Sequence, residues 1–205
     1  MPAPTIYYLR HGETEWNALG RLQGTQDSPL NARGRGQAVR AAGILADLFV
    51  RDGCDKAALS FVSSPLGRVR ATMELVRARL DLPPGDYALD DRLREVGYGV
   101  WEGSTLAESE ASHPDVYSRR LLDKWTVAPP GGETYAEAQV RMRDWYDSLV
   151  TDTVAVAHGG TARALMVALG LETARNAADL YIEQGVVYVF RTGNLTKYSL
   201  LTGEV

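Results

Sequence analysis

The sequence predicts an α/β protein, a three-layer α/β/α sandwich with a mostly parallel central sheet. Two observations carry this prediction. Short apolar, strand-like segments alternate with amphipathic helical segments along most of the chain, and the last two strand-like segments flank a turn sequence. Alternating strands and helices favour parallel pairing with helices on both faces of the sheet. The terminal hairpin is expected to add one or two antiparallel strands.

The first half of the chain contains two strand-helix pairs. Residues 5–9, TIYYL, have the apolar, β-branched and aromatic composition of a buried strand, and apolar residues then recur at helical spacing over 34–49. Residues 58–62, ALSFV, are the second predicted strand. A helix is predicted from the serines and proline near residue 63 to about Leu80, where the sequence DLPPGD ends it.

The middle of the chain is less regular. Residues 89–103 contain three glycines and little periodicity, so they are predicted to form a loop. Residues 104–127 look helical, but the His-Pro pair at 113–114 interrupts them.

The last third returns to alternating elements. Apolar residues over 138–149 recur at spacings of four, three and four, which predicts an amphipathic helix. Residues 153–157, TVAVA, are a buried strand that leads through two glycines into a helix capped by Gly170. The segments 186–190 and 195–200 alternate around RTGN and predict a hairpin.

Size and composition restrict the class of protein. The 205 residues suit a single domain, residues 1–205, and 45% hydrophobic with 23% charged residues is typical of a globular protein. A formal charge of -4 gives no general attraction to nucleic acid or to anionic membranes, so neither is an expected partner. Any anionic ligand must therefore be held by a local group of cations.

The N-terminal sequence and the cysteine content favour a cytoplasmic location. No basic and apolar leader precedes the first strand, and no apolar stretch approaches the length of a membrane span. Cys54 is the only cysteine, which excludes an internal disulfide and fits a reducing compartment.

Three strand-to-helix junctions carry unusual residues: LRHGET at 9–14, SSPLGRVRAT at 63–72 and VAHGGTAR at 156–163. Ligands of such sheets bind beyond the carboxyl ends of the strands, so we expect the junctions to face one pocket. His11 and His158 each follow a strand and precede a glycine, which lets the backbone approach a ligand closely. One such histidine alone is more often a structural hydrogen-bonding residue, but two together favour a function.

Arginines indicate what the pocket binds. Arg10 flanks His11, and Arg68 lies in the first turn of its helix without an acidic partner nearby in the sequence. Guanidinium groups and helix N-termini both suit phosphate oxygens, although a solvated surface arginine is the alternative for Arg68. A histidine that attacks phosphorus must be neutral, and two nearby cations would lower the pKa of His11 below its reference value of about 6.5.

These motifs resemble the histidine phosphatase superfamily, also called phosphoglycerate mutase-like. The resemblance covers most of the chain and includes LRHGETEWN, RLQGTQDSPLNARGRGQA, SSPLGRVRAT, LREVGYGVWEG, PPGGET and VAHGGTAR in order. It implies a phosphoglycerate mutase-like fold and a metal-independent histidine acid phosphatase-type enzyme that hydrolyses a small phosphomonoester through a phosphohistidine. Two departures are Asn31, where members commonly have threonine or serine, and residues 104–127, which follow no family pattern.

The resemblance also implies roles for individual residues. His11 matches the nucleophile, with the Gly12 carbonyl as the acceptor that fixes its tautomer and leaves Nε2 facing phosphorus. Glu95 matches the proton donor, which would protonate the leaving oxygen and later take a proton from water. The residues that match the phosphate-binding positions are Arg10, Arg68, His158, Asn17, the Gly159 backbone and, less directly, Gln23.

Three other interpretations stay open. A phosphoglycerate mutase would use the same pocket but retain the phosphoryl group; family mutases tend to be longer, which favours the phosphatase branch. His11, His158 and Glu95 could instead form an iron site, although two arginine charges would oppose the cation. A non-catalytic binder of phosphorylated ligands is disfavoured because every expected catalytic residue is present. No metal and no other cofactor are expected.

Substrate choice is assigned to residues 104–132, which by family analogy overhang the pocket. The residues of this helical substrate-specificity segment that could contact a substrate are His113, Tyr117, Arg119, Arg120 and Trp125. Sugar phosphates, phosphoglycerate derivatives, phosphoserine and nucleotide-pathway esters all fit, so the expected partner is a small phosphorylated metabolite. The sequence does not determine the oligomeric state, and a homodimer through an edge strand or a helix face is a fair expectation.

Overall fold

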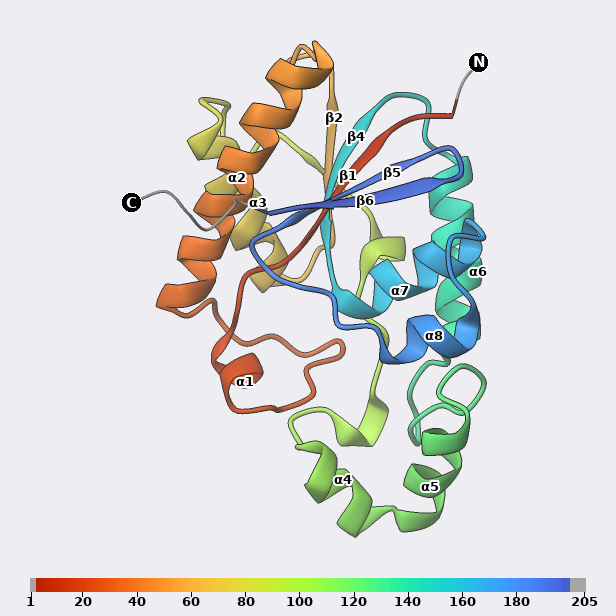
Figure 1. Ribbon diagram of the computed structural model, residues 1–205. Coiled ribbons are helices and arrows are strands. Elements are labelled where there is room, and N and C mark those ends of the chain that lie inside the picture. The colour runs from red at the N-terminus through yellow and green to blue at the C-terminus, as the bar shows by residue number, and fades with distance from the viewer. Residues whose placement is uncertain (1–2, 200–205) are drawn as a thin grey trace.

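The computed structural model describes residues 3–199, and its centre is a six-stranded sheet in the order β3-β2-β4-β1-β5-β6 (Figure 1). The strands are β1 (Ile6–Arg10), β2 (Ser60–Ser63), β3 (Ala88–Leu89), β4 (Thr153–Ala157), β5 (Val187–Arg191) and β6 (Asn194–Tyr198). The first four are parallel, β5 is antiparallel to β1, and β6 is antiparallel to β5. The predicted fold class is confirmed. Leu200, the end of the last predicted strand, lies outside the described residues.

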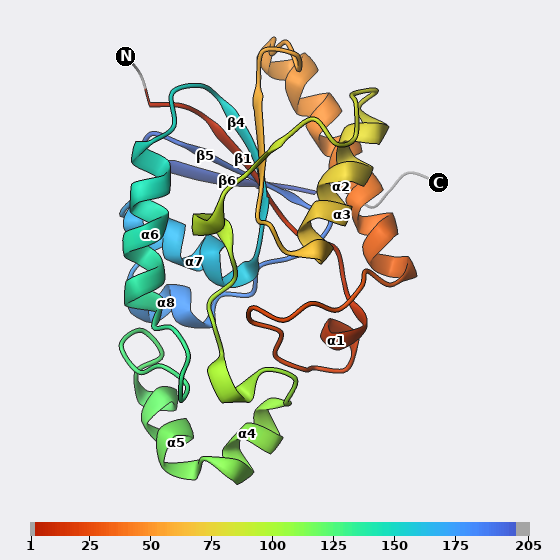
Figure 2. The same ribbon diagram turned by 180° about the vertical axis from the view of Figure 1, so that it is seen from behind.

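Helices cover both faces of the sheet (Figure 2). They are α2 (Ala32–Asp52) and α3 (Gly67–Arg79) on one face, and α6 (Tyr135–Asp147), α7 (Gly159–Ala168) and α8 (Ala174–Asp179) on the other. Alternate side chains of β1 enter the two cores: Tyr7 and Leu9 pack with α2 and α3, whereas Ile6 and Tyr8 pack with α6 and α7. The period of two along a strand therefore builds the three layers.

The helix predicted over 138–149 runs from Tyr135 to Asp147, and two other displaced boundaries have a clear cause. β2 begins at Ser60 rather than at residue 58, because the preceding residues form a turn in which the Ala58 N–H donates to the Asp55 carbonyl. The next helix begins at Gly67 rather than at the serines. The Ser64 N–H donates to the Val156 carbonyl at 3.1 Å, so the chain still follows β4 beyond the end of β2.

Several short elements were not predicted. They are α1 (Glu15–Ala18), α8, β3 and the 3₁₀ helices Asp91–Leu93 and Gly99–Trp101 within the predicted loop 89–103. None is long enough for hydrophobic periodicity to reveal it. In α1, Thr14 and Asn17 form a reciprocal capping box instead.

The irregular middle segment forms α4 (Leu106–Ser112) and α5 (Pro114–Leu122), and the break falls at the predicted His-Pro pair. Figure 1 places α1, α4 and α5 together beyond the end of the sheet at which β1, β2 and β4 finish.

Gly170 follows α7 with a φ of +68°, as expected for its predicted capping role. Asn31, the departure from the family pattern, caps α2 by accepting the Gly34 N–H, which a threonine or serine could also do. No helix among residues 3–199 has the length and apolar character needed to cross a membrane.

Candidate active site

The three junctions meet in a cavity of about 210 Å³ at the carboxyl ends of β1, β2 and β4. Parallel register places Arg10 of β1 beside Ala157 of β4 and Ser63 of β2 beside Val156, so the residues that follow these strands are neighbours. The predicted site residues that line the cavity are Arg10, His11, Asn17, Gln23, Arg68, Glu95 and Gly159. The structure thus brings together predicted residues from four separate stretches of the chain, namely 10–23, Arg68, Glu95 and Gly159.

His11 has the tautomer that a nucleophile needs. Its Nδ1 lies 2.8 Å from the Gly12 carbonyl, to which it donates, so Nε2 carries the lone pair. Burial lowers the pKa of His11 well below its ordinary value, and the charges of Arg68 and Arg10 lower it further. The predicted direction is confirmed, but burial rather than the two arginines is the larger cause. His11 is therefore neutral at physiological pH.

His158 lies behind the cavity rather than in its wall. Its ring is fully buried and its centroid lies 5.2 Å from that of His11. Nε2 lies 2.9 Å from Ser64 Oγ, and Nδ1 lies 3.3 Å from Nη2 of Arg68. Burial, followed by the Arg68 charge, lowers the pKa of His158 well below its ordinary value, so a neutral ring accepts from Arg68 and donates to Ser64. In this arrangement His158 orients Arg68, and its direct contact with phosphate stays a prediction.

The iron-site interpretation gains no support. Both ring nitrogens of His158 are engaged by Ser64 and Arg68. Within residues 3–199, no group of three histidine, cysteine, aspartate or glutamate side chains is placed to hold a metal ion.

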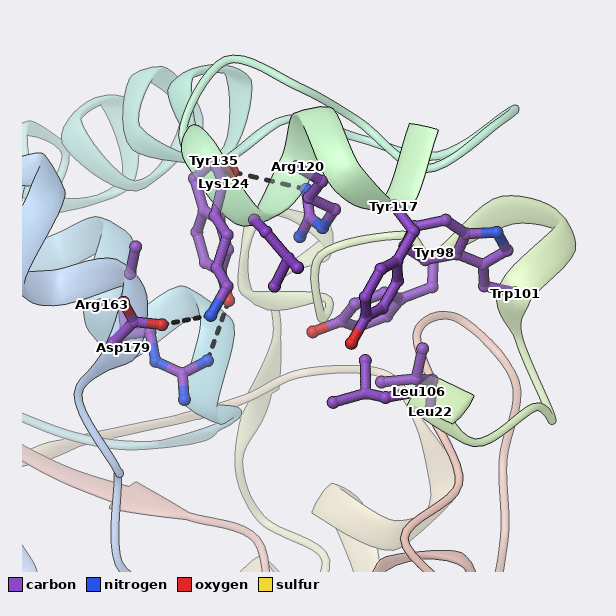
Figure 3. A pocket seen from close by; sticks show the side chains of 12 residues that line it. Leu22, Tyr98, Trp101, Leu106, Tyr117, Arg120, Lys124, Tyr135, Arg163 and Asp179 are labelled. Carbon is purple, nitrogen blue, oxygen red and sulfur yellow. Dashed lines mark hydrogen bonds and ion pairs between the residues drawn. The ribbon is translucent and has the colours of Figure 1, made fainter. Parts of the chain in front are cut away.

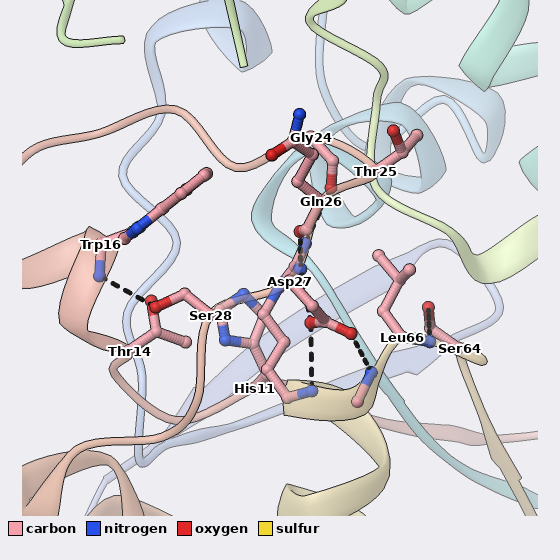
Figure 4. A network of polar contacts seen from close by, with 12 residues as sticks. His11, Thr14, Trp16, Gly24, Thr25, Gln26, Asp27, Ser28, Ser64 and Leu66 are labelled. Atoms are coloured by element: carbon pink, nitrogen blue, oxygen red, sulfur yellow. Dashed lines mark hydrogen bonds and ion pairs between the residues drawn. The ribbon is translucent and has the colours of Figure 1, made fainter. Parts of the chain in front are cut away.

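Arg68 is held by a loop that is distant in sequence. Its Nη1 donates to the Gln26 carbonyl and, at 2.9 Å, to Asp27 Oδ1; its Nη2 donates to the Gly24 carbonyl at 2.9 Å. Asp27 also accepts the backbone N–H groups of Gly67 and Arg68 at the start of α3 (Figure 4). Arg68 therefore has an acidic partner that its neighbouring sequence does not reveal, and it is buried rather than solvated.

The cavity concentrates the unsatisfied polar groups of the described chain. Within residues 3–199, the buried side-chain nitrogen and oxygen atoms without a hydrogen-bond partner are Arg10 Nε, Arg68 Nε and Gln23 Oε1. All three belong to residues that line this cavity. Buried donors are normally satisfied, and two unsatisfied guanidinium N–H groups on residues that line one small cavity suit a phosphate group.

Glu95 reaches the site because α7 begins with glycines. Its Oε1 accepts the N–H groups of Gly160 and Val96, each at 3.0 Å. A Cβ on Gly160 would lie 2.4 Å from Oε1, so only glycine leaves room for this carboxylate. Gly12, the glycine after His11, allows close packing against α2 rather than the expected approach to a ligand. A Cβ at this position would lie 2.2 Å from the Gly34 carbonyl of α2.

Several residues that line the cavity were not predicted from the sequence, namely Arg21, Leu22, Gly24, Tyr98, Gly160, Arg163 and Tyr181. Arg163 could have been found, because it lies four residues after Gly159 and therefore on the same face of α7. Tyr181 had no local signal, since it belongs to the connection between α8 and β5.

A second cavity of about 210 Å³ adjoins the first and shares with it the residues Leu22, Tyr98 and Arg163. Figure 3 shows Tyr98 and Tyr117 in its wall together with the charged ends of Lys124 and Arg163. Of the candidates in the substrate-specificity segment, Tyr117 and Arg120 line this cavity.

The other three candidates in that segment do not line either cavity. His113 accepts from Trp101 Nε1 at 3.2 Å, Trp125 is buried, and Arg119 is exposed.

Comparison with protein families matches residues 6–198 to the histidine phosphatase superfamily (branch 1). The chain belongs to this superfamily. It is 37% identical over 177 residues to a glucosyl-3-phosphoglycerate phosphatase of Mycolicibacterium vanbaalenii, covering 80% of this chain and 73% of the relative. It is 36% identical over 138 residues to a probable phosphoglycerate mutase GpmB of Escherichia fergusonii, covering 67% of this chain and 59% of the relative.

Solved structures of the superfamily share the fold. Bacillus stearothermophilus YhfR superposes with a TM-score of 0.79 at 30% identity, covering 99% of this chain and 98% of that one. The mycobacterial glucosyl-3-phosphoglycerate phosphatase Rv2419c in complex with VO3 gives 0.76 at 33% identity, covering 91% and 92%. A phosphatase that acts on a small phosphate ester is the activity that these relatives and the site support together.

Proposed function

We propose that this protein is a metal-independent phosphatase that transfers the phosphoryl group of a small phosphomonoester to His11 and then to water. One observation carries the proposal: a neutral, buried histidine with a free Nε2 lines the same small cavity as two arginines whose buried Nε–H groups have no hydrogen-bond partner within residues 3–199. Phosphoryl transfer depends mainly on positioning and on charge stabilisation, and this cavity supplies both.

In the first step, the lone pair of His11 Nε2 forms a bond to phosphorus while the bond from phosphorus to the leaving oxygen breaks. The ring becomes positively charged, and the Gly12 carbonyl accepts its Nδ1 proton. Protonated Glu95 gives its proton to the leaving oxygen, so the product departs as an alcohol. Arg10, Arg68 and the Gly159 N–H at the N-terminus of α7 stabilise the charge on the phosphoryl oxygens.

In the second step, water attacks phosphorus while the bond to Nε2 breaks. The Glu95 carboxylate takes a proton from this water, and His11 recovers its neutral ring as orthophosphate leaves. Glu95 thereby returns to the protonated form that starts the next cycle.

The test is to trap the phosphoenzyme. With a ³²P-labelled ester that the enzyme turns over, we expect label that is stable in alkali and labile in acid. His11→Ala should lose this label and lower kcat/KM by about 10³-fold or more, because it removes the nucleophile. His113→Ala, a histidine outside the cavity, is the matched control and should keep the label. Turnover by His11→Ala at the wild-type rate would contradict the proposal.

The mutase alternative is separated by its products. From 3-phosphoglycerate, a phosphatase releases glycerate and orthophosphate, whereas a mutase yields 2-phosphoglycerate. The GpmB relative keeps this comparison relevant, since it covers two thirds of the chain.

We further propose that the leaving group carries a carboxylate beside an apolar or sugar-like part. Arg163 stands in the wall shared by the two cavities, where its Nε donates to the Leu180 carbonyl and its Nη1 to Tyr135 Oη, both at 2.8 Å. Among the described ion pairs, Lys124 is matched by Asp179, whereas Arg163 has no acidic partner. An anionic group of the substrate would fill that role. The relatives named glucosyl-3-phosphoglycerate phosphatase suggest the same class.

Two substrates that differ at one carbon test this preference. Glycerol 3-phosphate has a hydroxymethyl group where 3-phosphoglycerate has its carboxylate. We expect Arg163→Met to lower kcat/KM for 3-phosphoglycerate about ten- to hundredfold and to leave glycerol 3-phosphate nearly unchanged, because a charge-assisted hydrogen bond is lost. Lys124→Met is the control and should affect neither. Equal losses with both substrates would contradict a carboxylate site at Arg163.

A further inference from the structure

The connection between α8 and β5 contacts three of the residues that form the phosphate pocket. The Ile182 carbonyl accepts from Arg10 Nη1 at 2.7 Å. The side-chain amide of Gln184 donates to the His11 carbonyl at 3.1 Å and to Asn17 Oδ1 at 3.2 Å. Gln184 thus connects the backbone of the nucleophile to Asn17, which lies 167 positions from Gln184 in the sequence.

This connection is itself held in place. Gly185 adopts a φ of +76°, and a Cβ there would lie 3.1 Å from the Gln37 side chain, so the chain passes closely over α2. The Glu183 N–H donates to Tyr188 Oη at 2.9 Å. Gln184 is therefore a rigid donor, flanked on both sides by contacts to the body of the protein.

Asn17 needs such a donor. It lies in α1, a helix of four residues, which is too short to be stable by itself. Its Oδ1 accepts from the Thr14 N–H at 3.2 Å and from Gln184 Nε2, so its NH₂ group is the end left for the cavity that Asn17 lines. Without Gln184, the Thr14 N–H would be the one described donor left to fix the orientation of this amide.

We propose that Gln184 is a positioning residue that aims the Asn17 amide at the phosphoryl group while it steadies the backbone of His11. The catalytic role of Gln184 rests on the proposed function, but its predicted effect on phosphate binding can be measured without turnover. Its effect on phosphate should pass through Asn17, and this dependence separates positioning from a general contribution to folding.

The experiment is a double-mutant cycle read out by calorimetric binding of orthophosphate. Gln184→Met keeps the length of the side chain and removes both donors. We expect it to raise the dissociation constant for orthophosphate, and KM for a turned-over ester, about five- to tenfold. In an Asn17→Ala background, the same substitution should change the dissociation constant by less than about twofold. Glu183→Gln is the matched control on the same connection, because Glu183 pairs with Lys197, and it should bind phosphate like the wild type.

Two results would overturn the proposal: wild-type phosphate affinity in Gln184→Met, or the same loss with and without Asn17. If Gln184→Met gives no cooperative thermal unfolding, Gln184→Glu replaces it, since a carboxylate facing two acceptor oxygens must weaken binding at least as much. Unchanged affinity in that variant would likewise overturn the proposal. A wild type that binds orthophosphate but hydrolyses no phosphomonoester would refute the proposed function and leave the cycle interpretable.

Discussion

Single side chains that line the active-site cavity are held by some of their polar atoms, while other polar atoms have no described partner. His11 is held through Nδ1, Asn17 through Oδ1, and Arg68 through both Nη atoms, whereas the Nε atom of Arg68 has no partner within residues 3–199. Such groups have little orientation left to lose when a ligand binds, which is the condition for electrostatic preorganisation.

The lack of a side chain at Gly160 predicts how Glu95 contributes to the rate. A methyl group there would displace the Glu95 carboxylate that it meets at 2.4 Å. We therefore expect Gly160→Ala to lower kcat about 10²-fold for glycerol 3-phosphate, whose leaving oxygen needs a proton. With p-nitrophenyl phosphate, which has a good leaving group, the loss should be much smaller, and steady-state rates on the two esters measure the difference.

The control for this variant is Gly43→Ala on α2, where a Cβ would meet nothing within 4 Å. It should hydrolyse both esters like the wild type. If Gly160→Ala lost activity equally on both esters, proton donation by Glu95 would not be the step affected.

The site residues that the sequence revealed either lie at the end of a strand or directly after it, as Arg10, His11 and His158 do, or belong to motifs that resemble the family, as Asn17 and Glu95 do. Asp27 and Gln184 were not predicted, because each contacts a site residue that is distant in sequence. No local sequence pattern indicates such a contact. Arg163 does carry a sequence signal, because it lies in the motif VAHGGTAR one helical turn after Gly159.

Among the elements, the loop before α2 and the start of α3 depend on each other. The loop supplies the Gly24 and Gln26 carbonyls and the Asp27 carboxylate to Arg68, and Asp27 also caps the N-terminus of α3, which lacks a cap from its own Leu66. Asp27 is 42% exposed, so its ion pair contributes little stability by itself. Its main effect is expected on the orientation of Arg68.

Asp27→Ala tests this coupling. We expect the free energy of unfolding to fall by about 1 kcal/mol through the lost cap, and KM for the ester to rise severalfold because Arg68 is less well oriented. Chemical denaturation and initial rates measure the two quantities.

Asn31→Ala, which removes the cap of α2 without touching Arg68, is the matched control. It should lower stability similarly and leave KM unchanged. A rise in KM in both variants would show that loss of a cap alone is sufficient.

Long amphipathic helices and buried strands were predictable because their periodicity extends over many residues. The helix α1 was not, because four residues held by a capping box and by Gln184 carry no period. The start of α3 was placed too early for a related reason: Ser64 bonds to β4, a partner that only the folded sheet brings near.

For the whole molecule, the order of the strands in the sheet could not be predicted from the sequence, since it follows from how the two cores pack. The sheet order puts β1 beside β4, which brings both histidines into the interior near Arg68. Their burial as neutral rings has a consequence for acid stability.

Both histidines have a folded-state pKa well below the ordinary value of about 6.5. Below pH 6.5 the unfolded chain binds protons that the native state does not, so the free energy of unfolding should fall as pH falls. Each histidine contributes a slope of about 1.4 kcal/mol per pH unit, and above pH 6.5 neither contributes. Chemical denaturation between pH 6.5 and 5 measures this slope.

His158→Gln should remove one histidine's share of the slope in that window. A slope equal to that of the wild type would mean that His158 is charged in the native protein.

The hydrogen-bonded pairing of β1 with β4 also sets the distance between His11 and His158. Adjacent strands lie about 4.8 Å apart, and the two imidazole centroids lie 5.2 Å apart, close to that spacing. The gap between the rings is thus inherited from peptide geometry rather than from the surrounding helices. Redesign of α4 and α5 for a substrate with another alcohol leaving group would therefore leave the distance between the two rings unchanged. A reaction that required a larger distance between the rings would need a different fold.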